Sequence, residues 1–226
     1  MKISFFLLMG ILLFYFTAVP GLQTGNPSSS PEARYFLEGK ENKVFLTFNV
    51  LWERDNLEYI LSTLKEHDIR AIFFVTGEWI KNFPYEAEEI INSGHYLGNK
   101  TLSHRRLLLL GEEETAAEIS EFNQLAVEKL NYSPQFFRPP YGEYNPKIIQ
   151  MAEEEGCVTL LWSINTLMLS ELETEIIISR LEEKLHDGAV LLFHTSSPQI
   201  ENNLEEIIEF IQWKGYNIAS PRLLKQ

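Results

Sequence analysis

Several segments of this 226-residue chain place polar and aromatic side chains directly after an apolar, β-rich run. They are TFNVLW (47–52), GNKTLSH (98–104), FRPPYG (137–142), WSINT (162–166) and LLFHTS (191–196). In the first, an amide, Asn49, and an apolar side chain, Val50, stand where a strand could deliver two carboxylates. An amide accepts no proton at a useful pH and valine binds no metal, so this pair predicts neither general-base nor metal chemistry.

The elements that carry these segments alternate in type. Continuous apolar strands are predicted over 43–48, 70–75, 134–138, 157–163 and 189–194, and amphipathic helices lie between them. Strand then helix, repeated about seven times, predicts an α/β fold with a parallel sheet covered by helices. Alternation alone leaves a closed barrel and an open doubly wound sheet as alternatives. In both, the working residues gather at the C-terminal ends of the strands.

At these strand ends the chain resembles the polysaccharide deacetylases with a NodB homology domain, carbohydrate esterase family 4. The segments FFVTGEW (73–79), GHYLGN (94–99) and FFRPPYGEYN (136–145) are close to the motif sequences of that family, and they occur in the same order. The resemblance implies a distorted (β/α)7 TIM-like barrel of the NodB, polysaccharide deacetylase type. It also implies hydrolysis of an acetamido group on a glycan by water bound to a divalent metal, usually zinc.

The metal-binding part of that machinery is replaced here. The family's general-base Asp corresponds to Asn49, its metal-binding Asp to Val50 and the following Gly to Leu51. Its first metal-binding His corresponds to Lys100, and only the second, His104, is retained. Since one imidazole does not hold zinc and an ammonium repels it, we expect no metal cofactor. His104 is then either a remnant ligand or a hydrogen-bonded residue of the rim.

The rest of the catalytic set is partly intact. Arg138, which in the family orients the base, and His194, its general acid, are present as catalytic remnants, whereas the Asp that tunes the acid is Asn165. The alternatives are that Arg138 makes a structural ion pair and that His194 serves packing. Aromatic side chains at strand ends could stack on sugars or plug the barrel mouth. The candidate substrate-binding residues are Tyr141, Pro139, Pro140 and Trp162.

Two further features have competing interpretations. The Lys100 ammonium could occupy the space of the metal and donate a hydrogen bond to the Asn49 amide oxygen, or it could lie on the rim in solvent. The run RRLLLLG (105–111) could form an exposed contact patch, but core packing is the default expectation for such a run.

The N-terminus indicates the compartment. After Lys2 comes a long uncharged run, and residues 1–21 are typical of a signal peptide or an N-terminal membrane anchor. Residues 22–41 are rich in Pro, Ser and Gly and predict a flexible linker. Residues 42–226 form the expected NodB-like domain, which we place outside the cytoplasm, secreted or anchored. A formal charge of −13, with 32 acidic and 19 basic residues, argues against a nucleic-acid partner.

The sequence therefore predicts a deacetylase-like protein that binds cell-wall or spore-cortex glycan and has lost metal-dependent de-N-acetylation. Two alternatives stay open: an active de-N-acetylase with an unusual site, and a non-catalytic protein-interaction module. The form TFNVLWERD (47–55) also resembles sporulation-associated members of the family.

Overall fold

The computed structural model describes residues 32–50, 56–166, 174–198 and 200–225. Its 8-stranded sheet has the order β5-β4-β3-β2-β1-β7-β6, with β8 paired to β1, and its paired strands are parallel. The strands are β1 (Lys43–Val50), β2 (Ile72–Val75), β3 (Tyr96–Asn99), β4 (Phe136–Phe137), β5 (Val158–Thr159), β6 (Ile164–Asn165), β7 (Val190–His194) and β8 (Asn217–Ile218).

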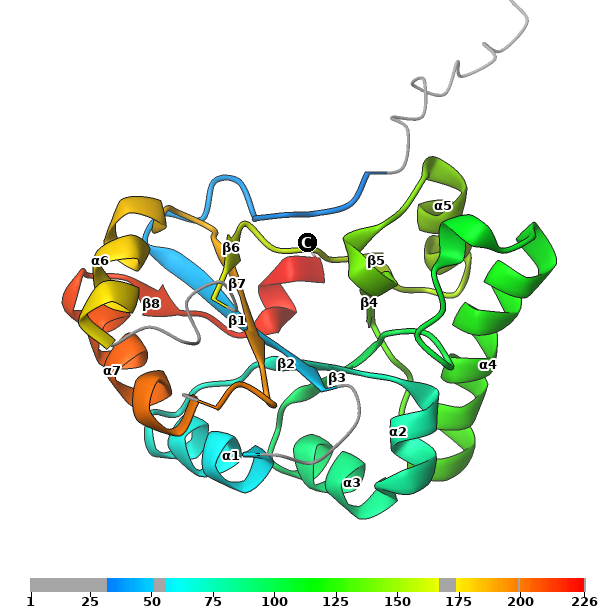
Figure 1. The fold of residues 1–226 in the computed structure, drawn as a ribbon, viewed down its shortest axis with the longest axis horizontal. Helices are drawn as coiled ribbons and strands as arrows, with labels where there is room; N and C mark the ends of the chain where they lie inside the picture. Colours follow the sequence, from blue (N-terminus) through cyan, green and yellow to red (C-terminus); the bar gives the residue numbers. More distant parts are fainter. Residues whose placement is uncertain (1–31, 51–55, 167–173, 199, 226) are drawn as a thin grey trace, which may run out of the picture.

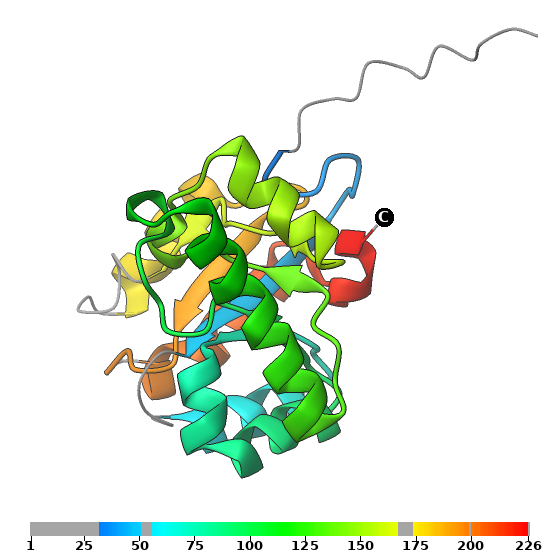
Figure 2. The same ribbon diagram turned by 90° about the vertical axis from the view of Figure 1, so that its right-hand side faces the viewer.

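The helices lie outside the curled sheet, as the alternation predicts. In Figure 1, α6 and α7 flank the strands on one side and α4 and α5 on the other, and Figure 2 looks onto α4 and α5. The helices are α1 (Leu57–Glu66), α2 (Gly77–Asn82), α3 (Pro84–Asn92), α4 (Glu112–Leu130), α5 (Pro146–Glu154), α6 (Thr174–Lys184) and α7 (Ile200–Trp213). Short 3-10 turns cover Leu107–Leu109, Pro140–Gly142 and Pro221–Lys225.

The central strand β1 is buried on both faces, which explains its continuous apolar sequence. Alternate side chains point to opposite sides of a strand. Leu46, Phe48 and Val50 pack in the large cluster that the sheet shares with its helices. Phe45 packs instead inside the barrel, in a cluster with Phe74 and other side chains. Thr47 and Asn49 share the parity of Phe45 and therefore face the barrel interior.

Residues 34–37 pair with the barrel, although the sequence predicts a linker there. Arg34 bridges Leu160 beside β5, and Phe36 bridges Ala189 beside β7. The segment therefore spans the region between the two ends of the strand order, as the blue strip in Figure 1 shows. Its close fit depends on Gly188, where an added Cβ would lie 1.9 Å from the Leu37 carbonyl oxygen. The ordered domain thus includes residues before position 42.

Two other expectations differ from the structure. Of the predicted strand over 157–163, only Val158–Thr159 (β5) is a strand, and β6 begins after it at Ile164. The leucine run is only partly core: Leu107 is buried, whereas Leu108 and Leu109 are 46% and 79% exposed. Within the described ranges, no helix is long and apolar enough to cross a membrane. The predicted leader, residues 1–21, lies outside those ranges.

Candidate functional site

The candidate residues converge on the C-terminal ends of the strands β4, β3, β1 and β7, with the end of β2 between β3 and β1. Asn49 and His194 are register partners at the ends of β1 and β7. Lys100 directly follows β3, and its backbone N–H donates to the Val75 carbonyl at the end of β2 at 3.0 Å. Arg138 directly follows β4, and its N–H donates to the Asn99 carbonyl at 2.9 Å. The parallel register therefore places these residues along one rim of the barrel.

Arg138 is the best-connected side chain of this rim, and it is fully buried. Its Nη1 donates to Asn49 Oδ1 at 3.2 Å and its Nη2 to Thr47 Oγ1 at 3.0 Å. Its Nε and Nη2 also donate to the carbonyls of Leu160 and Leu161, at 3.0 and 2.8 Å. These acceptors are neutral, and among the described residues no carboxylate pairs with the guanidinium. The structural ion pair considered for Arg138 is thus not seen in the described part of the chain.

Aromatic rings hold the Arg138 guanidinium in place. Its Cζ lies 4.0 Å from the centroid of Phe74 and 5.5 Å from that of Trp162. The Phe74 ring reaches this position because Gly98 on β3 has no side chain, and a Cβ there would lie 2.5 Å from the ring. Thr47 and Phe74 were not among the predicted site residues. The signal that could have identified Thr47 is its parity with Asn49, two residues later on the same face.

Lys100 is buried, being 2% exposed, so the interpretation that it lies on the rim in solvent is wrong. The proposed hydrogen bond from Lys100 to Asn49 is not formed either, and the Asn49 oxygen accepts from Arg138. Burial, and then the nearby charge of Arg138, hold the pKa of Lys100 well below its usual range. Within the described ranges, no acidic side chain lies within ion-pair distance of its ammonium.

The two histidines of the rim lie close to these cations. Burial and the charge of Lys100 lower the pKa of both rings to about 4, His194 also responding to Arg138. His104 has a positive φ of 60°, its backbone N–H donates to Thr101 Oγ1 at 3.0 Å, and its ring is 4.9 Å from Tyr141. Both imidazoles are therefore largely neutral at pH 7.

The predicted substrate-binding residues occupy different depths. Tyr141 is 54% exposed, and the Arg106 guanidinium lies 4.6 Å from its ring centroid. Trp162 is half-buried, whereas Pro139 and Pro140 are buried. The two buried prolines therefore offer little surface to a ligand. Asn165, at the end of β6, is half-buried and in register with Leu192. Leu51 lies outside the described residues.

The described residues of the rim do not include the ligand set of the zinc site that the resemblance implies. Zinc needs three or four ligands drawn from Cys, His, Asp and Glu. Across the described part of the chain, no group of at least three such side chains could hold a metal ion. The Val50 side chain packs among the helix-side apolar residues, and Lys100 brings a cationic group into the rim. The residues present therefore fit an anion better than a metal cation.

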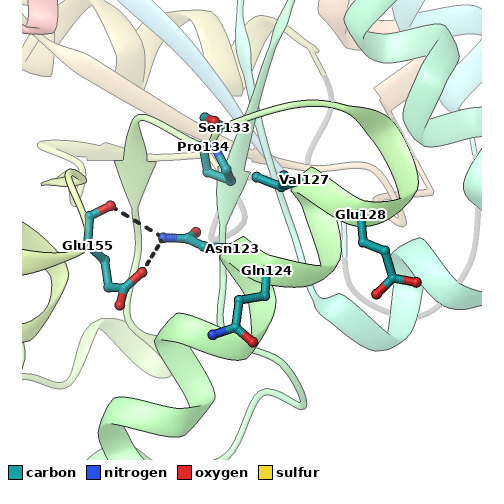
Figure 3. A pocket seen from close by; sticks show the side chains of 7 residues that line it. All are labelled: Asn123, Gln124, Val127, Glu128, Ser133, Pro134 and Glu155. Carbon is teal, nitrogen blue, oxygen red and sulfur yellow. Dashed lines mark hydrogen bonds between the residues drawn. The ribbon is translucent and has the colours of Figure 1, made fainter.

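A separate pocket lies on the outer side of the barrel, beside α4 (Figure 3). Its volume is about 430 Å³, and it is lined by Asn123, Gln124, Val127, Glu128, Ser133, Pro134 and Glu155. Asn123 Nδ2 donates to the Glu155 backbone oxygen at 3.4 Å and to its Oε2 at 3.2 Å. None of these lining residues is a candidate of the rim, so the pocket is not part of the site.

Comparison with known proteins places the chain among glycan-modifying enzymes and their relatives. The family model described as polysaccharide deacetylase matches residues 37–160. A peptidoglycan-N-acetylglucosamine deacetylase of Bacillus cereus is 32% identical over 190 residues, which are 80% of this chain and 68% of that protein. The uncharacterized protein YlxY of Bacillus subtilis is 29% identical over 195 residues. The aligned residues cover 85% of this chain and 60% of YlxY, so the chain spans about three fifths of the length of that relative.

Solved structures show the same fold. Wild-type BA3943, described as a CE4 family pseudoenzyme from Bacillus anthracis, superposes with a TM-score of 0.82 at 26% identity. The superposition covers 88% of this chain and 70% of BA3943. A BA3943 mutant, described as having restored enzymatic activity, matches with the same TM-score and identity, over 72% of its chain. These matches confirm the predicted barrel of the NodB type.

Proposed function

This chain belongs to the polysaccharide deacetylase family, and we propose that it is a non-catalytic member that binds glycan of the cell envelope. The observation that carries the proposal is the composition of the rim. Lys100 and Arg138 are buried there, and no described carboxylate lies within ion-pair distance of either. A site that activates water on a divalent cation needs anionic and neutral ligands instead.

The proton-transfer groups are as unsuited to the reaction as the metal site. Asn49 cannot act as a general base, and its oxygen already accepts a hydrogen bond from Arg138. His194 has a pKa lowered to about 4, so at neutral pH it lacks the proton that a general acid must donate. Even an intact general acid contributes only about 10²–10⁴-fold, which supports loss of de-N-acetylation rather than altered activity.

The relatives support a cell-envelope setting. One of them is a peptidoglycan-N-acetylglucosamine deacetylase, and BA3943 is a pseudoenzyme of the same family. Together with the predicted signal peptide or anchor in residues 1–21, this favours action outside the cytoplasm on cell-wall glycan. A spore-cortex glycan and a sporulation role follow from the resemblance of TFNVLWERD (47–55). The proposed organisation keeps a tether before the NodB-like domain of residues 42–226, to which the structure adds residues 34–37.

Two assays on the full chain test this proposal. With added zinc, we expect no acetate release from chitooligosaccharides or peptidoglycan, but co-sedimentation with insoluble peptidoglycan. Tyr141→Ala should weaken co-sedimentation, because the exposed ring lies beside the rim. Tyr85→Ala is the matched control, since Tyr85 is 81% exposed on α3. Zinc-dependent acetate release would instead support the active-enzyme alternative.

A second candidate function, a protein-interaction module, is favoured by the two exposed leucines. Leu108 and Leu109 lie on a 3-10 turn close to the rim residues His104 and Arg106. A photo-crosslinking side chain at position 109, compared with one at the 50% exposed Val127, would test it in cells. A partner protein crosslinked only from position 109, with no binding to peptidoglycan, would favour this candidate over the first.

A further inference from the structure

We infer that the rim between Lys100 and Arg138 binds a carboxylate group, carried by an acidic amino sugar of the glycan ligand. The inference rests on the proposed glycan binding and names the chemistry that the ligand needs. It assigns an anion-binding role to a place where the family resemblance implies a metal cation.

The first argument concerns the Lys100 ammonium. The side chain is 2% exposed, yet it donates no hydrogen bond to any described residue, and the charge that lowers its pKa beyond the effect of burial is another cation, Arg138. A buried ammonium without a counter-charge costs several kcal/mol. An anion beside Lys100 would supply both the missing acceptor and the missing charge.

The second argument concerns Arg138. Its Nε and Nη2 hydrogens and one Nη1 hydrogen are used by protein acceptors. A guanidinium carries five N–H donors, so one Nη1 donor is left for a ligand. The two rings that contact the guanidinium fix its orientation, and a charge-assisted hydrogen bond to a carboxylate is then favoured.

The third argument concerns the surroundings of these two cations. Lys100 and Arg138 directly follow the register partners Asn99 and Phe137, so both leave neighbouring parallel strands at the same edge of the sheet. His194 is half-buried and Tyr141 is exposed, so the rim borders the protein surface on that side. The chain as a whole has a formal charge of −13, so the two buried cations differ in sign from its net charge.

The test measures binding by calorimetry to the full chain, treated with chelator and checked for bound zinc. N-acetylmuramic acid differs from N-acetylglucosamine by a lactyl ether that carries a carboxylate. We expect the acidic sugar to bind at least about tenfold more tightly than the neutral one, in keeping with a charge-assisted hydrogen bond. Lys100→Met should abolish this preference and, by removing a buried charge, leave the melting temperature unchanged or higher.

The controls separate this inference from others. Arg105→Gln, at an exposed ion pair with Glu114, should leave the preference unchanged. Equal affinity for the two sugars in a zinc-free native chain would overturn the inference while leaving the proposed function standing. Acetate binding as tightly as N-acetylmuramic acid would overturn the assignment to a sugar.

Discussion

Arg138 organises the rim through neutral acceptors. The sequence indicates that it could orient Asn49, and the structure has that contact at 3.2 Å. The hydrogen bonds from Arg138 to the carbonyls of Leu160 and Leu161 could not be predicted, since every residue type has a backbone carbonyl. The identities of Asn49 and Lys100 were enough to question metal chemistry. The alternative partner of Asn49, Lys100, makes no such hydrogen bond, because residue types do not tell which of two buried cations reaches the amide.

The first prediction is that Arg138→Leu lowers the free energy of unfolding by about 3–5 kcal/mol, because buried acceptors such as Asn49 Oδ1 lose their donor. Urea unfolding followed by tryptophan fluorescence measures this change. Arg105→Gln, which removes an exposed ion pair with Glu114, should cost less than about 1 kcal/mol. Similar losses for the two variants would contradict the role given to Arg138.

The second prediction concerns pH and His95. Burial, and then Arg70, lower the pKa of this histidine from 6.5 to about 4, and its Nδ1 accepts a hydrogen bond from the Ala71 N–H at 3.2 Å. The unfolded chain therefore binds a proton that the folded chain does not. Stability present above pH 6.5 is lost as the pH falls from about 6.5 to about 4.

His95→Asn should reduce that loss by up to about 3 kcal/mol, since each pKa unit corresponds to about 1.4 kcal/mol and Asn keeps an acceptor. Urea unfolding at pH 7.5, 6, 5 and 4 measures the slope. His104 and His194 are shifted in the same direction, so part of the slope should persist. An unchanged slope in His95→Asn would contradict the assignment.

At the scale of elements, patterns that depend on neighbouring residues were predictable and those that depend on distant contacts were not. The amphipathic helix expected between the strands over 134–138 and 157–163 is α5, and the Asn145 side chain caps it by accepting from the Ile148 N–H. The pairing of residues 34–37 could not be predicted, because it joins Arg34 and Phe36 to positions far along the chain. The Pro- and Ser-rich composition before it favoured a linker.

The third prediction tests that pairing. In Gly188→Ala, the new Cβ would meet the Leu37 carbonyl, so the segment 34–37 should leave the barrel. Hydrogen exchange of the Leu37 N–H, which donates to the Gly188 carbonyl at 3.0 Å, should become at least about tenfold faster. Gly156→Ala is the matched control, because its φ of +76° is similar to that of Gly188 but no atom lies within 4 Å of its added Cβ. Equal protection of Leu37 in both variants would contradict the close fit.

At the scale of the whole molecule, the fold is retained while the group that the fold usually positions is replaced. The barrel, its motif order and Arg138 match the family, and the fold was predictable from alternation and these motifs. From the residue types Asn49, Val50 and Lys100, only the loss of metal-dependent catalysis was predictable. The sequence does not tell that Lys100 and Arg138 lie at the same rim, because this depends on which strands are neighbours in the sheet.

The central claim is that the native residues do not hold zinc, and metal content tests it most directly. The purified full chain would be dialysed against zinc and its bound metal counted by elemental analysis, beside the variant Asn49→Asp/Val50→Asp/Lys100→His. We predict a metal-free native chain and about one zinc per chain in the variant, in which Val50→Asp and Lys100→His restore two ligands beside the retained His104. One zinc bound per native chain would contradict the account.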